Sequence, residues 1–150
     1  MKASLPPADS LETAVTELTL AIGQLVRRLR AEANPGELSW SQAATLARLE
    51  KRGPLTTADM ARAESVKPQS MGTTLADLEE QGLVERRPHP TDGRQVLFAL
   101  TAAGIEARRK RRIAKQEWLL AKMTTLDPAE RKTLIAATAL IKRLGESRWP

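Results

Sequence analysis

The sequence predicts a mainly α-helical fold of six helices with one small antiparallel β-hairpin. Apolar residues recur at steps of three and four over most of the 150 residues, which is the helical period, and only residues 96–100 alternate as a strand does. Hydrophobic residues make up 41% of the chain but aromatic residues only 3%. We therefore expect a single domain with an aliphatic core.

The first helix is expected to be long and amphipathic. Asp9 and Ser10, followed by Glu12, resemble a capping box, and the sequence Asn-Pro-Gly at 34–36 stops the helix. Its apolar stripe contains Leu11, Val15, Leu18, Ile22, Leu25 and Leu29.

The next three helices are predicted over residues 39–52, 56–64 and 68–81 from their end signals. The starting residues are Ser39 with Gln42 as its capping-box partner, Thr56 or Thr57, and Pro68, which takes the first helical position. Glycine follows the first and the third of these helices. Only the turn 65–67 separates the last two, which indicates a helix-turn-helix.

The helix over 68–81 has two different faces. Leu75 and Leu78 fall within roughly 40° of Met71 on a helical wheel, and the three residues define the buried stripe. The opposite face is small and, near the helix start, polar and uncharged; it carries Gln69, Gly72, Thr73, Ala76 and Asp77. Gln69 offers both a donor and an acceptor to a base edge, so this face suits close contact with DNA.

The β-hairpin is predicted to contain a long loop over residues 88–94. A two-residue turn centred on Asp92-Gly93 would place Phe98 opposite Arg87, whereas a longer loop of odd length pairs Leu100 with Val84. Pro88 and Pro90 lack backbone donors and confine the first strand to a sheet edge.

The tip of this loop carries Asp92 and Arg94. An arginine on a projecting loop can enter a narrow minor groove, and Asp92 is expected to hold the guanidinium of Arg94 in line by a bidentate contact. A solvated loop with an ordinary surface ion pair explains the loop alone equally well. The neighbouring helix-turn-helix pattern favours DNA.

Two helices complete the chain. Thr101 is predicted to cap a helix of about 24 residues, and Asp127, Pro128 and Glu130 open a last helix. The stripe of that last helix contains Leu134, Thr138, Ile141 and Leu144. The run Arg-Arg-Lys-Arg-Arg at 108–112 spreads around its helix, so a solvated face that steers DNA electrostatically is favoured over direct contact.

Composition restricts the classes of function. The net charge of +6 and the pI of about 10.2 favour a polyanionic partner. The chain has no cysteine and one histidine, His89, which argues against disulfides, thiolate chemistry and a polyhistidine zinc site. We expect no cofactor, no metal site, no catalytic residues and no enzymatic activity. Neither a signal peptide nor an apolar run of about 20 residues is visible, so we expect a cytoplasmic protein without a membrane partner.

The segment 66–104 resembles the DNA-binding core of the MarR family of bacterial transcriptional regulators. The matching strings are Leu78-Glu79-Glu80-Gln81-Gly82-Leu83-Val84-Glu85-Arg86, Asp92-Gly93-Arg94 and Leu100-Thr101-Ala102-Ala103-Gly104. The helix order extends the resemblance over nearly the whole chain. It implies a winged helix-turn-helix lobe over 38–100, flanked by an N-terminal dimerisation helix in 1–37 and C-terminal dimerisation helices in 101–150.

The resemblance further implies a homodimer that binds a palindromic double-stranded DNA operator, usually as a repressor, and that a small aromatic or phenolic effector releases. Apolar stripes without an obvious partner in so small a chain agree with a dimer. The residues expected at that interface are Leu11, Val15, Leu18, Ile22, Leu134, Ile141 and Leu144.

Residue roles follow from the matching positions. Gln69 and Thr73 are predicted to read bases, and Arg94, with Asp92, to occupy the minor groove. Phosphate or backbone contacts are assigned to Lys67, Ser70, Thr74, Arg86 and Arg87. For Ser70 and Thr74, capping or local hydrogen bonding is an equally good interpretation.

Two residues have competing interpretations. Trp40 either lines the effector crevice or belongs to the core, and the core is favoured, as it is for Trp118. His89 stands where many relatives carry an acidic residue; an exposed imidazole without a role is favoured over one that softens repulsion from phosphate. The competing function for the whole chain is a winged-helix adaptor that binds protein and no specific DNA.

Overall fold

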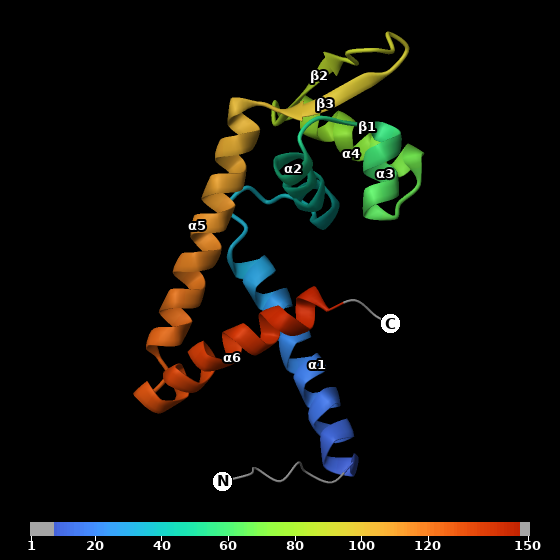
Figure 1. The fold of residues 1–150 in the computed structure, drawn as a ribbon. Coiled ribbons are helices and arrows are strands. Elements are labelled where there is room, and N and C mark those ends of the chain that lie inside the picture. The colour runs from blue at the N-terminus through green and yellow to red at the C-terminus, as the bar shows by residue number, and fades with distance from the viewer. Residues whose placement is uncertain (1–7, 148–150) are drawn as a thin grey trace. The chain divides into compact units, whose positions relative to one another are not determined.

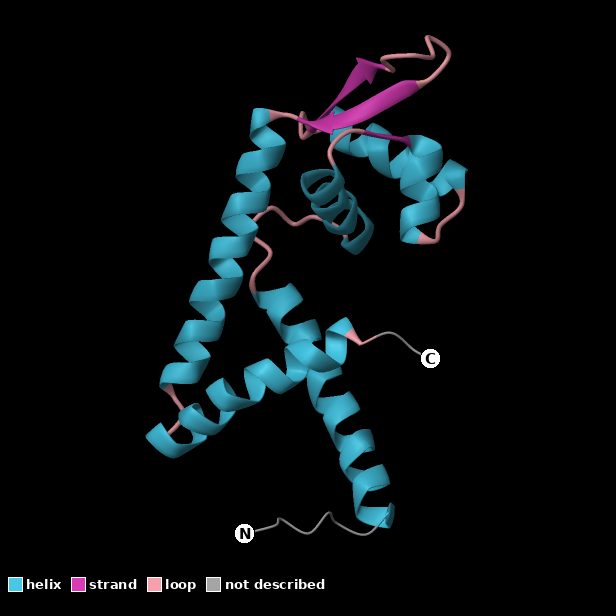
Figure 2. Cartoon of the chain, viewed as in Figure 1, coloured by secondary structure: helices cyan, strands magenta, loops and turns pink. Residues whose placement is uncertain are grey.

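The computed structural model describes residues 8–147. In chain order, the elements of this part are α1 (Ala8–Glu32), α2 (Trp40–Arg52), β1 (Leu55–Thr56), α3 (Thr57–Glu64), α4 (Pro68–Glu80), β2 (Val84–Pro88), β3 (Val96–Leu100), α5 (Ala102–Thr124) and α6 (Pro128–Glu146) (Figures 1 and 2). The predicted six helices and antiparallel hairpin are confirmed. β1 was not predicted, because two residues carry no periodic signal.

The chain divides into two compact units. One unit is continuous, Ala33–Ala114, and contains the helix-turn-helix, the sheet and the first half of α5; it reaches further at both ends than the predicted lobe 38–100. The other combines α1 with the second half of α5 and α6.

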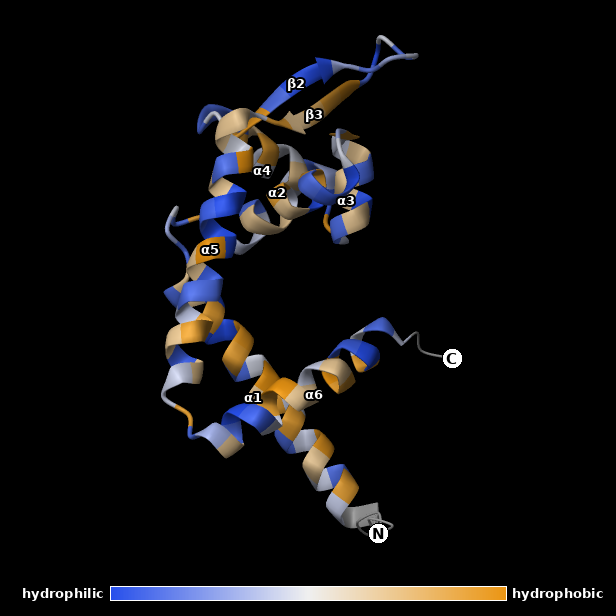
Figure 3. Ribbon diagram, turned by 60° about the vertical axis from the view of Figure 1, so that its left-hand side comes forward, coloured by the Kyte–Doolittle hydropathy of each residue, from blue (hydrophilic) through white to orange (hydrophobic). Residues whose placement is uncertain are grey.

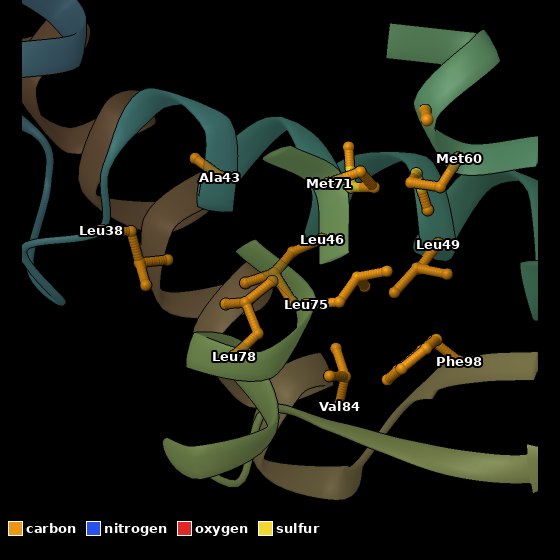
Figure 4. Packing of buried hydrophobic residues seen from close by; sticks show 11 residues of the cluster. Leu38, Ala43, Leu46, Leu49, Met60, Met71, Leu75, Leu78, Val84 and Phe98 are labelled. Carbon is orange, nitrogen blue, oxygen red and sulfur yellow. The ribbon is translucent and has the colours of Figure 1, made fainter. Parts of the chain in front are cut away.

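The core of the 33–114 unit is aliphatic, as the low aromatic content predicts. Figure 4 shows side chains from α2, α3 and α4 meeting those of β2 and β3. The side chains with the least exposure include Leu46, Met60, Leu75, Leu78 and Val84. Full burial of a side chain of this size is worth about 1.5–3 kcal/mol, so this cluster fixes the angle between the helices and the sheet.

Local signals set most helix starts. The capping box at α2 is formed as predicted: Ser39 Oγ accepts from the Gln42 amide at 3.2 Å, and Gln42 Oε1 accepts from the Ser39 amide at 2.9 Å. Thr56 caps α3 through the Asp59 amide. The cap expected at Asp9 and Ser10 is wrong, because α1 already includes Ala8.

The sheet is antiparallel with strand order β1-β3-β2. Val84 pairs with Leu100 and Arg86 with Phe98, which confirms the longer loop and excludes the two-residue turn. β2 lies at an edge, as its proline requires, and Figure 2 shows the loop continuing beyond the ends of both strands. Residues 89–95 are called the wing loop from here on.

Thr101 and Gly104 join the wing to α5. Thr101 Oγ1 accepts from the Gly104 amide at 3.0 Å and donates to the Gly82 carbonyl oxygen at 2.6 Å. A Cβ atom on Gly104 would collide with the carbonyl oxygen of Leu83. The Leu-Thr-x-x-Gly string is therefore a packing motif that anchors the start of α5 against the turn after α4.

The second unit has no buried residue among those described in 8–32 and 115–147. Apolar residues nevertheless run along α1 and α6, and Figure 3 shows them in orange on both helices. All seven residues predicted at a dimer interface are at least 38% exposed: Leu11, Val15, Leu18, Ile22, Leu134, Ile141 and Leu144. These stripes have no partner within their own unit that removes them from water.

Candidate nucleic-acid interface

The outward face of α4 is polar and open. Met71, Leu75 and Leu78 turn the other side of the helix into the core, as predicted. Gln69 and Thr73 are exposed one helical turn apart near the helix start. The two residues predicted to read bases therefore lie on a surface that another molecule can approach closely.

The threonine hydroxyls of α4 bond within the helix. Thr73 Oγ1 donates to the Gln69 carbonyl oxygen and Thr74 Oγ1 to the Ser70 carbonyl oxygen, each at 3.2 Å. For Thr74 this bond agrees with the interpretation as local hydrogen bonding, which the sequence left open beside a phosphate contact. Because a hydroxyl oxygen keeps its acceptor capacity when its proton is used, Thr73 is expected to accept from a base amino group.

Arg86 and Arg87 leave β2 on opposite faces, and each already has a carboxylate partner. Arg86 Nε lies 2.9 Å from Glu79 Oε2 of α4, and the guanidinium stacks 5.3 Å from the centroid of Phe98. Arg87 pairs with Glu85 at 2.8 Å. Both pairs are exposed, so each is worth about 0–1 kcal/mol and can be exchanged for a phosphate.

Asp92 organises the backbone of the wing loop. Its Oδ1 accepts from the Arg94 amide at 3.0 Å, and its Oδ2 accepts from the side-chain amide of Gln95 at 3.1 Å. The predicted bidentate contact with the guanidinium of Arg94 is therefore wrong. Within residues 8–147 that guanidinium makes no ion pair with Asp92 or any other carboxylate, and it stays available to an external anion.

His89 also has a structural role, contrary to the favoured interpretation. Its Nδ1 accepts from the backbone amides of Asp92 at 3.1 Å and Thr91 at 3.3 Å. The imidazole thus caps the first turn of the wing loop. A carboxylate oxygen can cap amides in the same way, so the imidazole nitrogen performs a role that an acidic side chain could also perform.

The basic run on α5 stabilises the fold of the lobe. Arg108 and Arg112 both pair with Glu50 of α2, at 3.0 and 3.3 Å. Arg111 is 4% exposed and bonds to the Asn34 side chain. The interpretation of this run as a solvated face is therefore wrong for Arg108 and Arg111, whereas Arg109, Lys110 and Arg112 are exposed.

These arginines also set the ionisation of Glu50. Burial disfavours the charged carboxylate, but the hydrogen bonds and positive charges of Arg108 and Arg112 outweigh it and hold the pKa of Glu50 below its ordinary value. The pair to Arg108 ties α2 to the first half of α5 inside the 33–114 unit.

Trp40 is exposed at 58%, so its assignment to the core is wrong. It borders a hollow of about 120 Å³ beside Ser70 and Thr74. Small-molecule sites are usually about 300–1,000 Å³, so this hollow is small for an effector. A larger one, of about 530 Å³, lies in the same unit and is lined by Asn34, Leu38, Leu83, Ala107, Lys110 and Arg111, among others. We call it the α5 hollow.

Sequence reasoning missed two residues of this surface. Arg62, on the last turn of α3, and Glu79, near the end of α4, both face the wing side of the lobe through their contacts with Asp59 and Arg86. The spacing of three between Asp59 and Arg62 was a visible signal for the first pair. The second pair, between Glu79 and Arg86, depends on the hairpin register.

No group of three or more His, Cys, Asp or Glu side chains in residues 8–147 is placed to hold a metal ion. Across the same part of the chain, every helix is too short or too polar to cross a bilayer.

The chain is similar to known transcriptional regulators in sequence and in fold. Residues 38–96 match the model of the MarR family. An HTH-type transcriptional regulator of Mycobacterium leprae, ML2140, is 38% identical over 136 residues, which cover 91% of this chain and 95% of that protein. The protein belongs to the MarR family.

Solved structures agree with a MarR fold. RV1404 from Mycobacterium tuberculosis superimposes with a TM-score of 0.77 at 26% identity, covering 98% of this chain and 100% of that one. A MepR mutant from Staphylococcus aureus, bound to an oligodeoxyribonucleotide, gives a TM-score of 0.69 at 20% identity, with 88% of this chain and 96% of that one covered. As a MarR-family protein with this helix-turn-helix, the chain is a DNA-binding transcriptional regulator.

Proposed function

We propose that this regulator is a homodimer that binds a palindromic operator, represses transcription from it, and leaves it when a small aromatic or phenolic molecule binds. The observation that carries the proposal is the pairing, in one lobe, of the uncharged face of α4 with a wing loop whose Arg94 has no carboxylate partner within residues 8–147. The first suits base edges in a major groove and the second a minor groove.

The base contacts are assigned to Gln69 and Thr73. Lys67 is the N-cap of α4, and we assign a phosphate contact to its ammonium, which forms no ion pair within residues 8–147. Ser70, Arg86 and Arg87 supply further backbone contacts. A regulator of this kind loses affinity with salt at a slope of about −0.9 for every phosphate neutralised.

Dimerisation is supported by the exposed stripes of α1 and α6. Sixteen large hydrophobic side chains are exposed in the described chain, and twelve of them lie on α1, α6 or the second half of α5. A twofold axis would place each stripe against its copy and hide both. It would also set two lobes at a fixed spacing, which a palindrome with half-sites about one helical turn apart requires.

Effector control is supported by the α5 hollow. Its size falls in the usual range for small ligands, its walls combine leucine and alanine side chains with amide and cationic groups, and it lies in a single unit. Asn34 and Arg111, which line it, are close to the two points where the chain leaves the 33–114 unit. Trp40 remains the alternative effector residue.

Selection of bound sequences from a random duplex pool tests the proposal. Recovery of one inverted repeat, bound by a species with the mass of two chains, is the expected result. An adaptor that binds protein would enrich no sequence, and its binding would be unaffected by Arg94→Ala. A monomer that binds a single unrepeated site would overturn the dimeric part alone.

A further inference from the structure

A second hollow, of about 590 Å³, lies on the DNA-facing side of the lobe, between α3, α4 and the wing. We call it the wing-root hollow. Its lining includes Thr57, Asp59 and Arg62 of α3, Gly72 of α4, Arg86 of β2 and Arg94 of the wing loop.

The hollow is electrostatically suited to an anion. Three arginines and one aspartate line it. Asp59 is held by Arg62 Nη1 at 2.9 Å, and Arg86 is held by Glu79, while Arg94 has no carboxylate partner within the described chain. The Arg62 side chain is 77% exposed, so a phosphate can replace or share its carboxylate partner at little cost.

The position of the hollow identifies the anion. A major groove and the adjacent minor groove are separated by one sugar–phosphate strand. A duplex that receives α4 in the first groove and the wing loop in the second must pass that strand between the two elements. The wing-root hollow is the depression between them.

Gly72 supplies an independent argument. Glycine is a poor helix former, and nothing in the fold requires it at this position. No atom lies within 4 Å of the place that its Cβ would occupy, and its φ is not positive. Gly104, by contrast, is required because its Cβ would meet a backbone oxygen. Gly72 therefore keeps space open on the outer surface, where only an external molecule can use it.

We propose that the wing-root hollow seats the sugar–phosphate strand between the two grooves, with Gly72 as the point of closest approach and Arg62 as a phosphate ligand beside Arg94. This inference rests on the proposed DNA-binding mode of α4 and the wing. It adds two residues, Arg62 on α3 and Gly72 on α4, that contact the DNA backbone and read no base.

The first test fills the hollow. Gly72→Leu is expected to retain or raise the melting temperature, because leucine is the better helix former, and to weaken binding of the selected duplex by about tenfold or more, with random duplex weakened equally. Gly72→Ala should give a smaller loss in the same direction. Ala63→Leu places the same side chain at an exposed α3 position outside the hollow and should bind as the wild type does.

The second test probes Arg62 through the DNA. A selected duplex is made with a single neutral methylphosphonate, stepped along the strand between the two grooves. At one position the losses from Arg62→Ala and from the methylphosphonate should be non-additive, because both remove the same contact. This measurement does not depend on Gly72 variants and reports on a folded protein with one altered surface side chain.

The outcomes distinguish a failure of the proposed function from a failure of the proposed role of the wing-root hollow. If the wild type enriches no sequence, the proposed function fails. If it binds its palindrome but Gly72→Leu binds equally tightly, or if Arg62→Ala is additive with the methylphosphonate at every position, the wing-root hollow is not the seat of the strand and the inference is overturned.

Discussion

The carbonyl oxygen of Leu83 occupies the space that a Cβ atom on Gly104 would need. The same oxygen accepts a hydrogen bond from the Thr101 amide at 3.2 Å, and the Thr101 hydroxyl donates to the Gly82 carbonyl oxygen. These two hydrogen bonds hold the start of α5 against the turn. The turn after α4 and the first turn of α5 are therefore packed backbone to backbone, with no room for a side chain between them.

Gly104→Ala is accordingly expected to destabilise the protein by about 2 kcal/mol or more, because backbone on one side must move. Urea denaturation followed by circular dichroism measures the change. Gly145→Ala in α6 is a suitable control, since nothing lies near its Cβ position. A Gly104→Ala midpoint equal to that of the wild type would show that the turn relaxes without cost.

Glu50→Gln is expected to lower stability at neutral pH but not at acid pH. The folded pKa of Glu50 is depressed below 4.5, so the ionised carboxylate stabilises the native state above the ordinary value, and that stability is lost as the pH falls through the lower folded value. Denaturation of both proteins at pH 7 and at a series of pH values that falls below 4.5 and past the folded pKa of Glu50 measures the difference. A stability difference between Glu50→Gln and the wild type that persists unchanged in acid would argue against the ion pairs of Glu50 with Arg108 and Arg112.

Glu79→Gln is expected to raise the affinity for random duplex severalfold and to steepen its salt dependence. Glu79 now neutralises Arg86 and also presents a negative charge to DNA, so its removal frees one cation for a phosphate. Titration of a labelled random duplex at several salt concentrations tests this, with Glu80→Gln on the same helix as the control. A loss of affinity would mean that Glu79 positions Arg86 for its contact.

His89→Ala is expected to loosen the wing loop and reduce DNA affinity by several-fold, with little change in the melting temperature. The reason is that the amides of Thr91 and Asp92 lose their shared acceptor. His89→Asn offers an acceptor at a similar reach and should restore binding. Hydrogen exchange of the Asp92 amide reports on the loop directly, and equal protection in all three proteins would contradict the capping role.

Leu18→Asp is expected to weaken dimerisation by at least about a hundredfold, since a twofold interface would lose two buried leucines and gain two charges. Sedimentation velocity over a range of concentrations measures the shift toward monomer. Gln24→Asp, off the apolar stripe of α1, carries the same charge and should leave the dimer intact. Operator binding should fall together with dimerisation in the first variant alone.

The features predicted correctly from sequence depend on short-range patterns. Ser39 and Gln42 are three residues apart and cap the same turn, so the pattern is sufficient to locate the helix start. The hairpin register also followed from side-chain alternation alone, because only odd loop lengths place Val84 and Leu100 on the same face.

The incorrect predictions concern side chains whose hydrogen-bond or ion-pair partners are distant in sequence, or side chains for which two partners compete. Glu50 lies 58 residues from Arg108, and Asn34 lies 77 from Arg111, so no periodicity could show that the basic run was already paired. The carboxylate of Asp92 could accept from either the guanidinium or the backbone amide of Arg94, and in the structure it accepts from the amide. The exposure of Trp40 depends on how α2 is rotated in the core, which its own sequence does not determine.

The strand order leaves the outer edge of β2 unpaired. Such an edge invites another molecule to add a strand, which is how many proteins begin to aggregate. Here the edge ends in Pro88, which has no amide hydrogen to donate, and carries charged side chains at Glu85, Arg86 and Arg87. The side chains assigned to the DNA backbone thus also protect the protein's solubility, so exchanging them for apolar ones would produce insoluble material before any loss of regulation could be measured.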